Sequence, residues 1–149
     1  MPAYQTPAGK TKKGRAAVNE RAKILMQKLG ISEVADNDIN EVSGGQLQRA
    51  CICRSLINHP RILFADEPTG ALNKQSSHEV MEELNRIHKE GTSILLVTHD
   101  MKVASRCDRV LYIEDGNIRD EMQIGAWEDC TDIRKRERRL NEWLITLGW

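Results

Sequence analysis

One stretch, residues 42–67, constrains what this chain can fold into more than any other. It reads VSGGQLQRACICRSLINHPRILFADE. A small polar turn at residues 43–46 precedes a helical pattern that a proline interrupts. The apolar run at residues 62–65 then leads into two adjacent carboxylates, Asp66 and Glu67. Since unbroken apolar runs are typical of strands that are covered on both faces, the stretch predicts a turn, a helix and a buried strand in that order.

Helical and strand patterns alternate through the rest of the chain. The expected helices cover residues 16–29, 44–58, 75–89, 101–106 and 131–147. The expected strands cover residues 62–66, 93–98, 109–113 and 118–122, and an Asp-Gly hairpin turn at 115–116 joins the last two. Strands that alternate with helices imply an α/β fold with a mostly parallel sheet.

Composition narrows the class of protein. The 149 residues fit one domain by length, and 40% hydrophobic with 30% charged residues is the balance of a soluble globular protein. The 22 basic and 22 acidic residues cancel, so overall charge gives no argument for nucleic acid binding. No apolar run reaches membrane-spanning length and no signal peptide is visible, so we expect a cytoplasmic chain.

The four cysteines do not form a recognisable framework. Cys51 and Cys53 are two apart on an expected helix and therefore point to different faces. Cys107 and Cys130 have no CxxC or CxxH companion. This spacing favours reduced cysteines that pack in the interior over a metal site.

Three segments are expected along the chain: a flexible basic segment at 1–14, the main α/β domain at 15–122, and a tail with an amphipathic helix at 123–149. The first segment contains Gly9-Lys10-Thr11, which matches the end of a phosphate loop. The full pattern GxxxxGK[ST] needs a glycine at position 4, where the chain has Tyr4, and a buried strand before it. We interpret these residues as a basic surface turn.

Polar residues that could carry chemistry follow two of the expected strands. Asp66 and Glu67 end the first strand, and His99 follows the second. Parallel sheets present ligands at the carboxyl ends of their strands, so the three side chains are expected at one edge. Asp66 suits a hydrated Mg²⁺, Glu67 suits a base that orients water for attack on a phosphoryl group, and His99 suits a hydrogen bond to a terminal phosphate.

The turn at residues 43–46 has the features of an anion site. Gly44 and Gly45 allow close approach of the backbone, and the following helix N-terminus offers unpaired N–H groups with a partial positive charge. Ser43 is placed to cap that helix and adds a hydroxyl donor. The turn alone is a weak signal, and it gains weight from the helix and the Asp-Glu strand that follow it.

These motifs resemble those of ABC-type ATPases over residues 17–121. VSGGQ is similar to the signature motif, which usually begins with Leu, and ILFADE is similar to the Walker B strand with its catalytic Glu. Ala71-Leu72-Asn73 resembles the D-loop, with Asn73 where Asp is commoner, and His99 matches the switch histidine. The GALN variant resembles ATPases of antimicrobial-peptide and bacitracin exporters, relatives of the macrolide and lipoprotein-release exporters.

The resemblance implies a partial P-loop NTPase fold with ATP and Mg²⁺ as cofactors. Two nucleotide-binding domains of this family form a head-to-tail dimer around two ATP molecules and drive a membrane permease. By resemblance, Asp66, Glu67 and His99 serve this subunit's own ATP, with Asp66 on the metal. The residues that serve the partner's ATP are Ser43, Gly44, Gly45 and Gln46, with Asn73 in the D-loop. A second ATPase subunit, a permease at the cytoplasmic face of the plasma membrane and no nucleic acid are the expected partners.

The family's Walker A loop, adenine-stacking aromatic and Q-loop glutamine have no counterpart in these residues. The expected function is therefore the carboxy-terminal part of an exporter ATPase for peptide-like or lipophilic compounds, inactive as an ATPase alone. A truncated gene, an internal start or one piece of a split subunit would each explain it. The alternative is a binding module that lends its signature turn to an intact ABC ATPase, or inhibits it. Chromosome-maintenance and ribosome-acting ABC classes fit less well, since they carry long coiled coils or two cassettes.

Two further expectations concern surfaces. Without the family's first strands, one side of the sheet and its edge would be exposed, which predicts marginal folding or association through that face. The basic tail helix at 131–147 could touch a membrane surface or pack on the domain with its arginines in water. Its shared apolar face favours packing.

Overall fold

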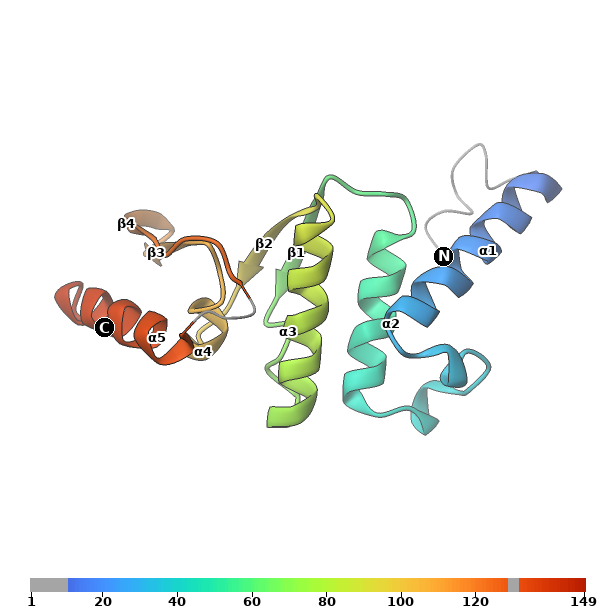
Figure 1. The fold of residues 1–149 in the computed structure, drawn as a ribbon, viewed down its shortest axis with the longest axis horizontal. Coiled ribbons are helices and arrows are strands. Elements are labelled where there is room, and N and C mark those ends of the chain that lie inside the picture. Colours follow the sequence, from blue (N-terminus) through green and yellow to red (C-terminus); the bar gives the residue numbers. More distant parts are fainter. Residues whose placement is uncertain (1–10, 129–131) are drawn as a thin grey trace. The chain divides into compact units, whose positions relative to one another are not determined.

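The computed structural model describes residues 11–128 and 132–149. They form two compact units, residues 1–96 and 97–149, which we describe one at a time (Figure 1). The predicted segment boundaries at 14/15 and 122/123 stay predictions. Tyr4, Gly9, Lys10 and Cys130 lie outside the described residues.

The described residues of the first unit form three α-helices and two strands. The helices are α1 (Lys12–Lys28), α2 (Gly44–Leu56) and α3 (Lys74–Lys89), and the strands are β1 (Ile62–Asp66) and β2 (Ser93–Val97). Two 3₁₀ turns, η3 (Ser32–Val34) and η4 (Ile39–Glu41), connect α1 to α2. β1 and β2 run parallel in one sheet, with α3 as the connection between them (Figure 1). The predicted α/β class with a parallel sheet is confirmed.

Helix α1 begins earlier than the sequence pattern indicates. Thr11 caps it by accepting a hydrogen bond from the Gly14 N–H at 3.0 Å, so residues 12–14 are helical. The composition of this segment predicts loop, but a threonine cap supplies the acceptor that a helix start needs. Gly30, with φ of +62°, follows the helix end as expected, since glycine adopts this conformation without strain.

The strands of the first unit are not covered on both faces, which corrects the prediction for residues 62–66. Leu63 is buried, whereas Ile62, Phe64 and Leu95 are 53%, 75% and 49% exposed. The alternation arises because successive strand residues point to opposite faces and the described sheet has only two strands. The predicted exposure of one face of the sheet is therefore confirmed.

The described residues of the second unit form a β-hairpin and two helices. These are α4 (Met101–Ala104), β3 (Arg109–Glu114), β4 (Asn117–Gln123) and α5 (Ile133–Thr146). β3 pairs only with β4, antiparallel, in a sheet separate from β1 and β2. This corrects the expectation that strand 109–113 continues a mostly parallel sheet. The Asp-Gly turn is confirmed, with φ of +50° at Asp115 and +74° at Gly116.

Helix α5 packs on the hairpin. Leu140, Leu144 and Ile124 form the core of this unit, with Val110, Tyr112 and Met122 against it. The Trp143 indole N–H donates to Asp120 Oδ2 at 3.0 Å, and the Trp143 ring meets Tyr112 edge to face at 6.5 Å. The interpretation of the tail helix as a packed element is therefore confirmed for its apolar face.

Arg136 is the buried cation of the second unit, with 6% of its surface exposed. Its guanidinium donates to the carbonyl oxygens of Ser105, Ala126, Cys107 and Gly125 at 2.7, 3.3, 2.8 and 2.9 Å. The four carbonyls belong to the segment after α4 and the segment after β4, so one side chain joins both to α5. Carbonyl dipoles replace the water that a buried cation loses.

Candidate functional site

The turn at residues 43–46 forms the start of helix α2. Ser43 is the N-cap, and its Oγ accepts a hydrogen bond from the Gln46 N–H at 3.3 Å. The Gln46 Oε1 in turn accepts from the Ser43 N–H at 2.8 Å. The two residues thus make a reciprocal capping box, which confirms the predicted cap and adds a role for Gln46.

The hydrogen bonds of this cap occupy acceptor atoms of the two side chains, and their donor groups remain available to a ligand. The Ser43 Oγ and Gln46 Oε1 are both engaged as acceptors, while the Ser43 hydroxyl hydrogen and the Gln46 amide group keep their donors. Within residues 11–128 and 132–149, the Gly44 and Gly45 N–H groups have no acceptor. The helix N-terminus adds a partial positive charge. The turn can therefore bind an anion such as a phosphate group.

Both glycines of this turn also meet a packing requirement. A Cβ on Gly45 would lie 2.9 Å from Ser76 Oγ and 3.0 Å from Ser76 Cβ on α3. A Cβ on Gly44 would lie 3.3 Å from Leu72 Cδ2, in the loop after β1. Close approach to a ligand is thus not the only reason for glycine here, because α2 needs a residue without a side chain at Gly45.

Asp66 and Glu67 lie at the carboxyl end of β1, as predicted. Asp66 is exposed and Glu67 half-buried. Glu67 has φ of +43°, in the left-handed region that costs a non-glycine residue about 1–2 kcal/mol. The Gly70 N–H then donates to the Glu67 carbonyl oxygen at 3.2 Å and closes a turn. Such strain commonly occurs at functional positions. Here the left-handed conformation of Glu67 turns the chain sharply away from the strand.

Asn73 is the N-cap of α3. Its Oδ1 accepts a hydrogen bond from the Ser76 N–H at 2.9 Å. Asparagine and aspartate cap helices about equally well, so Asn73 keeps the local structure that the commoner Asp would provide. Its predicted contact with nucleotide stays a prediction.

His99 lies between β2 and α4. The Asp100 N–H donates to Thr98 Oγ1 at 3.0 Å, and Asp100 Oδ1 accepts from the Lys102 N–H at 2.8 Å, so this link is an ordered turn with a helix cap. His99 belongs to the second unit and the two carboxylates to the first. Their predicted convergence therefore stays a prediction.

A polar link between α2 and α3 supports the turn and was not foreseen. Arg49 Nη1 donates to Glu79 Oε2 at 2.7 Å, and Gln75 Nε2 donates to Glu79 Oε1 at 2.9 Å. Both hydrogen bonds hold the pKa of Glu79 below its usual value, and the one from Gln75 has the larger effect. The Gln75–Glu79 pair has helical i, i+4 spacing, but no spacing connects Arg49 to Glu79.

The described residues offer few groups that could bind a metal ion or react as thiolates. No cluster of three or more His, Cys, Asp or Glu side chains able to hold a metal occurs in the described part of the chain. Asp66 offers a single carboxylate, which suits an ion that keeps most of its waters, as Mg²⁺ does. Cys51, Cys53 and Cys107 are free thiols, and burial raises the pKa of Cys107 to about 11. The prediction of unbridged cysteines is confirmed for these three, and that of interior packing for Cys53, whereas Cys51 and Cys107 are half-buried.

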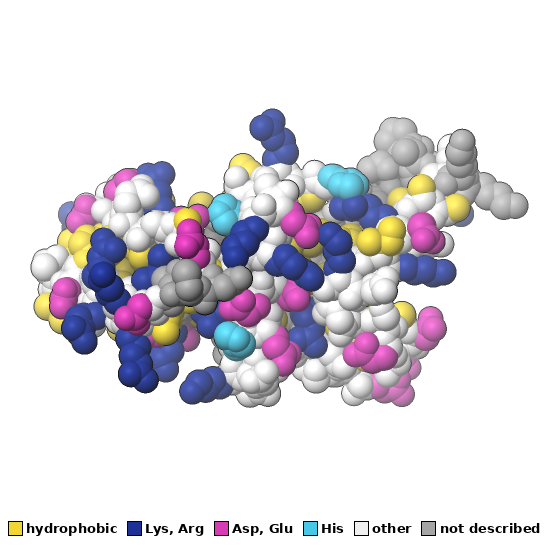
Figure 2. Space-filling view, viewed as in Figure 1, with side chains coloured by type: hydrophobic (Ala, Val, Ile, Leu, Met, Phe, Trp, Pro, Cys, Tyr) yellow, Lys and Arg dark blue, Asp and Glu magenta, His cyan; other side chains and the backbone are white. Residues whose placement is uncertain are grey.

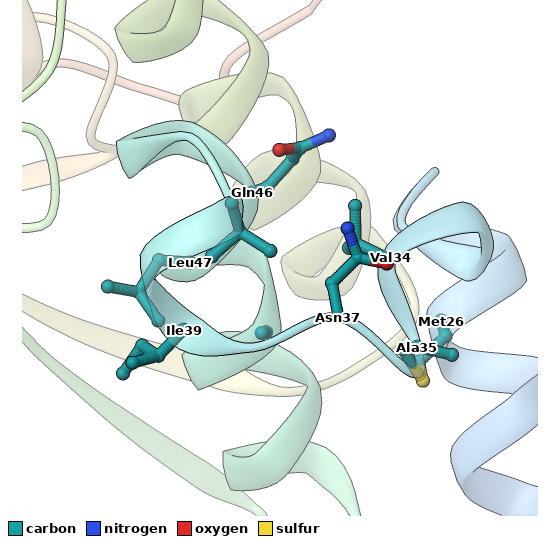
Figure 3. Close-up of a pocket in the computed structure, with 9 residues that line it drawn as sticks. Met26, Val34, Ala35, Asn37, Ile39, Gln46 and Leu47 are labelled. Atoms are coloured by element: carbon teal, nitrogen blue, oxygen red, sulfur yellow. The ribbon is translucent and has the colours of Figure 1, made fainter.

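An open cavity of about 230 Å³ lies beside the turn, between α1, the 3₁₀ turns and α2 (Figure 3). Its lining consists of Met26, Val34, Ala35, Asn37, Ile39, Val42, Gln46, Leu47 and Ala50. None of these side chains titrates, so the cavity cannot supply acid–base chemistry. Among the described helices, none is long and apolar enough to cross a membrane.

Comparison with known proteins identifies related sequences. Residues 3–70 match the family model described as ABC transporter. The chain is 45% identical over 114 residues to a macrolide export ATP-binding/permease protein, MacB, of Shewanella sp. (strain ANA-3), covering 76% of this chain and 17% of that protein. A MacB of Bartonella henselae is 48% identical over 99 residues, covering 66% and 15%. The chain thus spans less than a fifth of these relatives' length.

Solved structures share the fold. The dimeric ATP-binding cassette MJ0796 in a post-hydrolysis state, bound to ADP and Pi, matches with a TM-score of 0.63 and 33% identity. The match covers 72% of this chain and 47% of that one. The ADP conformation of the cassette MJ1267 matches with a TM-score of 0.72 at 20% identity, which supports the fold alone.

Proposed function

Since this chain carries part of an ABC-type nucleotide-binding domain, we propose that it supplies the signature turn of an ATP site completed by a second ABC ATPase subunit. The observation that carries the proposal is the turn at residues 43–46, whose capping box uses the Ser43 Oγ and Gln46 Oε1 acceptors internally and does not use the hydroxyl and amide donors of these side chains. A terminal phosphate is the anion such a turn suits. The dimeric MJ0796 cassette bound to ADP and Pi supports an arrangement of two subunits.

The second element of the proposal concerns hydrolysis of this subunit's own ATP and gives separate roles to Asp66, Glu67 and His99. Bound Mg²⁺ would neutralise phosphate charge, and Asp66 would accept hydrogen bonds from its waters. Glu67, held by its strained backbone, would orient an attacking water. His99 would donate to a phosphate oxygen.

The biological setting of the proposal is an exporter of peptide-like or lipophilic compounds. The MacB relatives are macrolide export proteins that combine ATP-binding and permease functions, which supports a membrane permease as partner. The chain would then act at the cytoplasmic face of the membrane. No phosphate-loop pattern GxxxxGK[ST] occurs in the 149 residues, so the phosphate loop of the ATP site at residues 43–46 would come from the second subunit.

Titration of the chain into an intact nucleotide-binding domain tests the proposal. The domain of the Shewanella MacB is a suitable partner because it is 45% identical to this chain where the two align. We expect a saturable change in its ATP hydrolysis rate. A rise would indicate a completed site, and a fall would indicate competition for the partner's phosphate loop, which is the alternative form of the proposal.

Ser43 allows a matched pair of variants. Aspartate and asparagine both cap helices as well as serine does, so Ser43→Asp and Ser43→Asn keep α2 intact. Only aspartate places a negative charge where the phosphate would bind. We expect Ser43→Asn to retain part of the effect and Ser43→Asp to abolish it. An unchanged rate at high excess of wild type, or equal effects of the two variants, would refute the proposal.

A further inference from the structure

Helix α5 has one buried face and one open face. Arg136, Leu140 and Leu144 are buried against the rest of the second unit. Four basic residues on the opposite side are exposed: Arg134, Lys135, Arg138 and Arg139. Figure 2 shows Lys and Arg side chains gathered over α5 on the face in view. The packing of α5 described above therefore leaves a basic surface uncovered.

This basic face has little internal compensation. Among residues 11–128 and 132–149, no ion pair involves any of the four side chains. The spacing of Arg134 to Arg138 and of Lys135 to Arg139 is i, i+4, so like charges are neighbours and repel. Glu142, one turn further on, is the only acid on the same side.

The position of the charges is also unfavourable for the helix itself. Arg134 and Lys135 lie in the first turn, where the helix dipole favours acids, and the first turn contains no acidic residue. Asp132 caps their N–H groups at 3.0 and 3.3 Å and offsets part of this. Neither ion pairs nor the helix dipole accounts for these basic residues, so they remain available to an external anion.

Apolar residues continue the same face toward the end of α5. Ile145, seven residues after Arg138 and so two turns along, is 61% exposed. Trp149, just beyond the helix, is 56% exposed. Cationic residues followed by exposed Ile and Trp are typical of helices that lie in a membrane interface, where Trp prefers the headgroup level.

We propose that the open face of α5 binds anionic lipid headgroups directly. Arg134, Lys135, Arg138 and Arg139 contact the headgroups, and Ile145 and Trp149 enter the boundary with the acyl chains. The two apolar residues favour a lipid surface over nucleic acid, which would use cations and stacking but gains nothing from Ile145. This contact is additional to any attachment through a permease and does not depend on ATP.

Vesicle flotation tests this inference with the full chain. Wild type should float with phosphatidylglycerol vesicles, should float much less with phosphatidylcholine vesicles, and should be released by high salt. Replacing the four basic residues by Gln should lower the partition coefficient by about tenfold or more. A control variant with Gln at exposed Lys23, Arg54, Arg61 and Lys102 removes the same charge elsewhere and should bind more tightly than the α5 variant.

A second variant distinguishes insertion of apolar side chains into the lipid from electrostatic attraction of the basic residues to an anionic surface. Ile145→Ser with Trp149→Ser keeps every charge and should still weaken flotation by a fewfold. Thermal melting checks that each variant is folded. Equal binding to both lipids, equal loss in the two Gln variants, or no effect of the serine pair would overturn the inference. Binding to an oligonucleotide without flotation would also overturn it in favour of nucleic acid, whatever the outcome of the ATPase titration.

Discussion

At Gly45, helix α2 comes so close to α3 that no side chain fits. A methyl group there would lie 2.9 Å from Ser76 Oγ and 3.0 Å from Ser76 Cβ, and the second atom cannot rotate away. Gly45→Ala should therefore lower the free energy of unfolding by about 1–3 kcal/mol, the usual cost of overpacking, as measured by urea denaturation.

The double variant Gly45→Ala with Ser76→Gly is the control for this clash. Ser76→Gly alone should destabilise by roughly 0.5–1 kcal/mol because glycine is unfavourable within a helix. If the clash is real, the double variant should be more stable than the sum of the two single changes predicts. Strict additivity would show that Gly45 is required for another reason.

Cys107 gives the second unit a predictable alkaline response. Burial raises the pKa of its thiol from 9.0 to about 11 in the folded chain. Between these values the unfolded chain loses the proton and the folded chain keeps it, so stability is full below pH 9 and falls as pH rises toward 11. Cys107→Ala should remove this part of the pH dependence, of the order of 2 kcal/mol at its largest.

Urea unfolding monitored across this pH range measures the effect. The stability of wild type relative to Cys107→Ala should be constant below pH 9 and should fall as pH rises toward 11, by about 2 kcal/mol in all. Parallel curves would mean that the thiol is not buried in solution. At pH 7 the thiol is protonated in both the folded and the unfolded chain. The difference in free energy of unfolding between wild type and Cys107→Ala at this pH therefore measures only the packing contacts that the variant loses.

Single residues show where sequence reasoning succeeds. The cap at Ser43 and the Asp-Glu pair at the end of β1 follow from local patterns, because capping and strand termination involve neighbours in the chain. Ser76 beneath Gly45 and the four carbonyls around Arg136 involve residues up to 31 positions apart. No periodicity encodes such contacts, so only the structure reveals them.

At the scale of elements, β1 and β2 expose apolar side chains that their sequences suggest should be buried. Phe64, at 75% exposed, is the most exposed large apolar residue of the described chain. Exposed apolar strand faces promote association. Phe64→Glu should therefore reduce concentration-dependent oligomers in sedimentation velocity while leaving thermal stability little changed, since few contacts are lost.

Two further variants test whether the effect belongs to this face. Ile39→Glu changes a residue that is 67% exposed outside the sheet and should leave association as it is in wild type. Leu63→Glu, at a buried position of the same strand, should instead unfold the unit. A monomeric wild-type chain at all concentrations would contradict the prediction.

The first and last residues of the helices and strands could be predicted to within a few positions. The assignment of strands to sheets was harder to predict. The strand at residues 62–66 matches β1, since apolar runs bounded by turns are local signals. The Asp-Gly turn correctly predicts β4 as the antiparallel partner of β3, whereas the expectation that these strands continue the parallel sheet is wrong, because β3 and β4 form a separate sheet. The turn is a signal between neighbours in the chain, whereas the assignment of strands to one sheet depends on contacts between distant segments.

For the whole molecule, the central question is whether the chain can hydrolyse ATP by itself. Asp66 and Glu67, the residues proposed for hydrolysis, lie at the end of β1, but the 149 residues contain no GxxxxGK[ST] pattern to hold the phosphates. Without that nest of N–H groups and its lysine, the charge on the phosphates has no counterpart beside Glu67. We therefore expect the purified chain to release phosphate from ATP only at the background rate.

The variant Glu67→Gln distinguishes ATP hydrolysis by this chain from hydrolysis by contaminating enzymes. The substitution removes the carboxylate that would orient water and keeps the size of the side chain, so contaminating ATPases are unaffected by it. The isolated wild type and Glu67→Gln should give the same rate with Mg²⁺ and ATP. A rate that depends on Glu67 would show that the chain binds the phosphates through residues other than a phosphate loop. The proposal of a site completed by a second subunit would then have to give way to a self-sufficient enzyme.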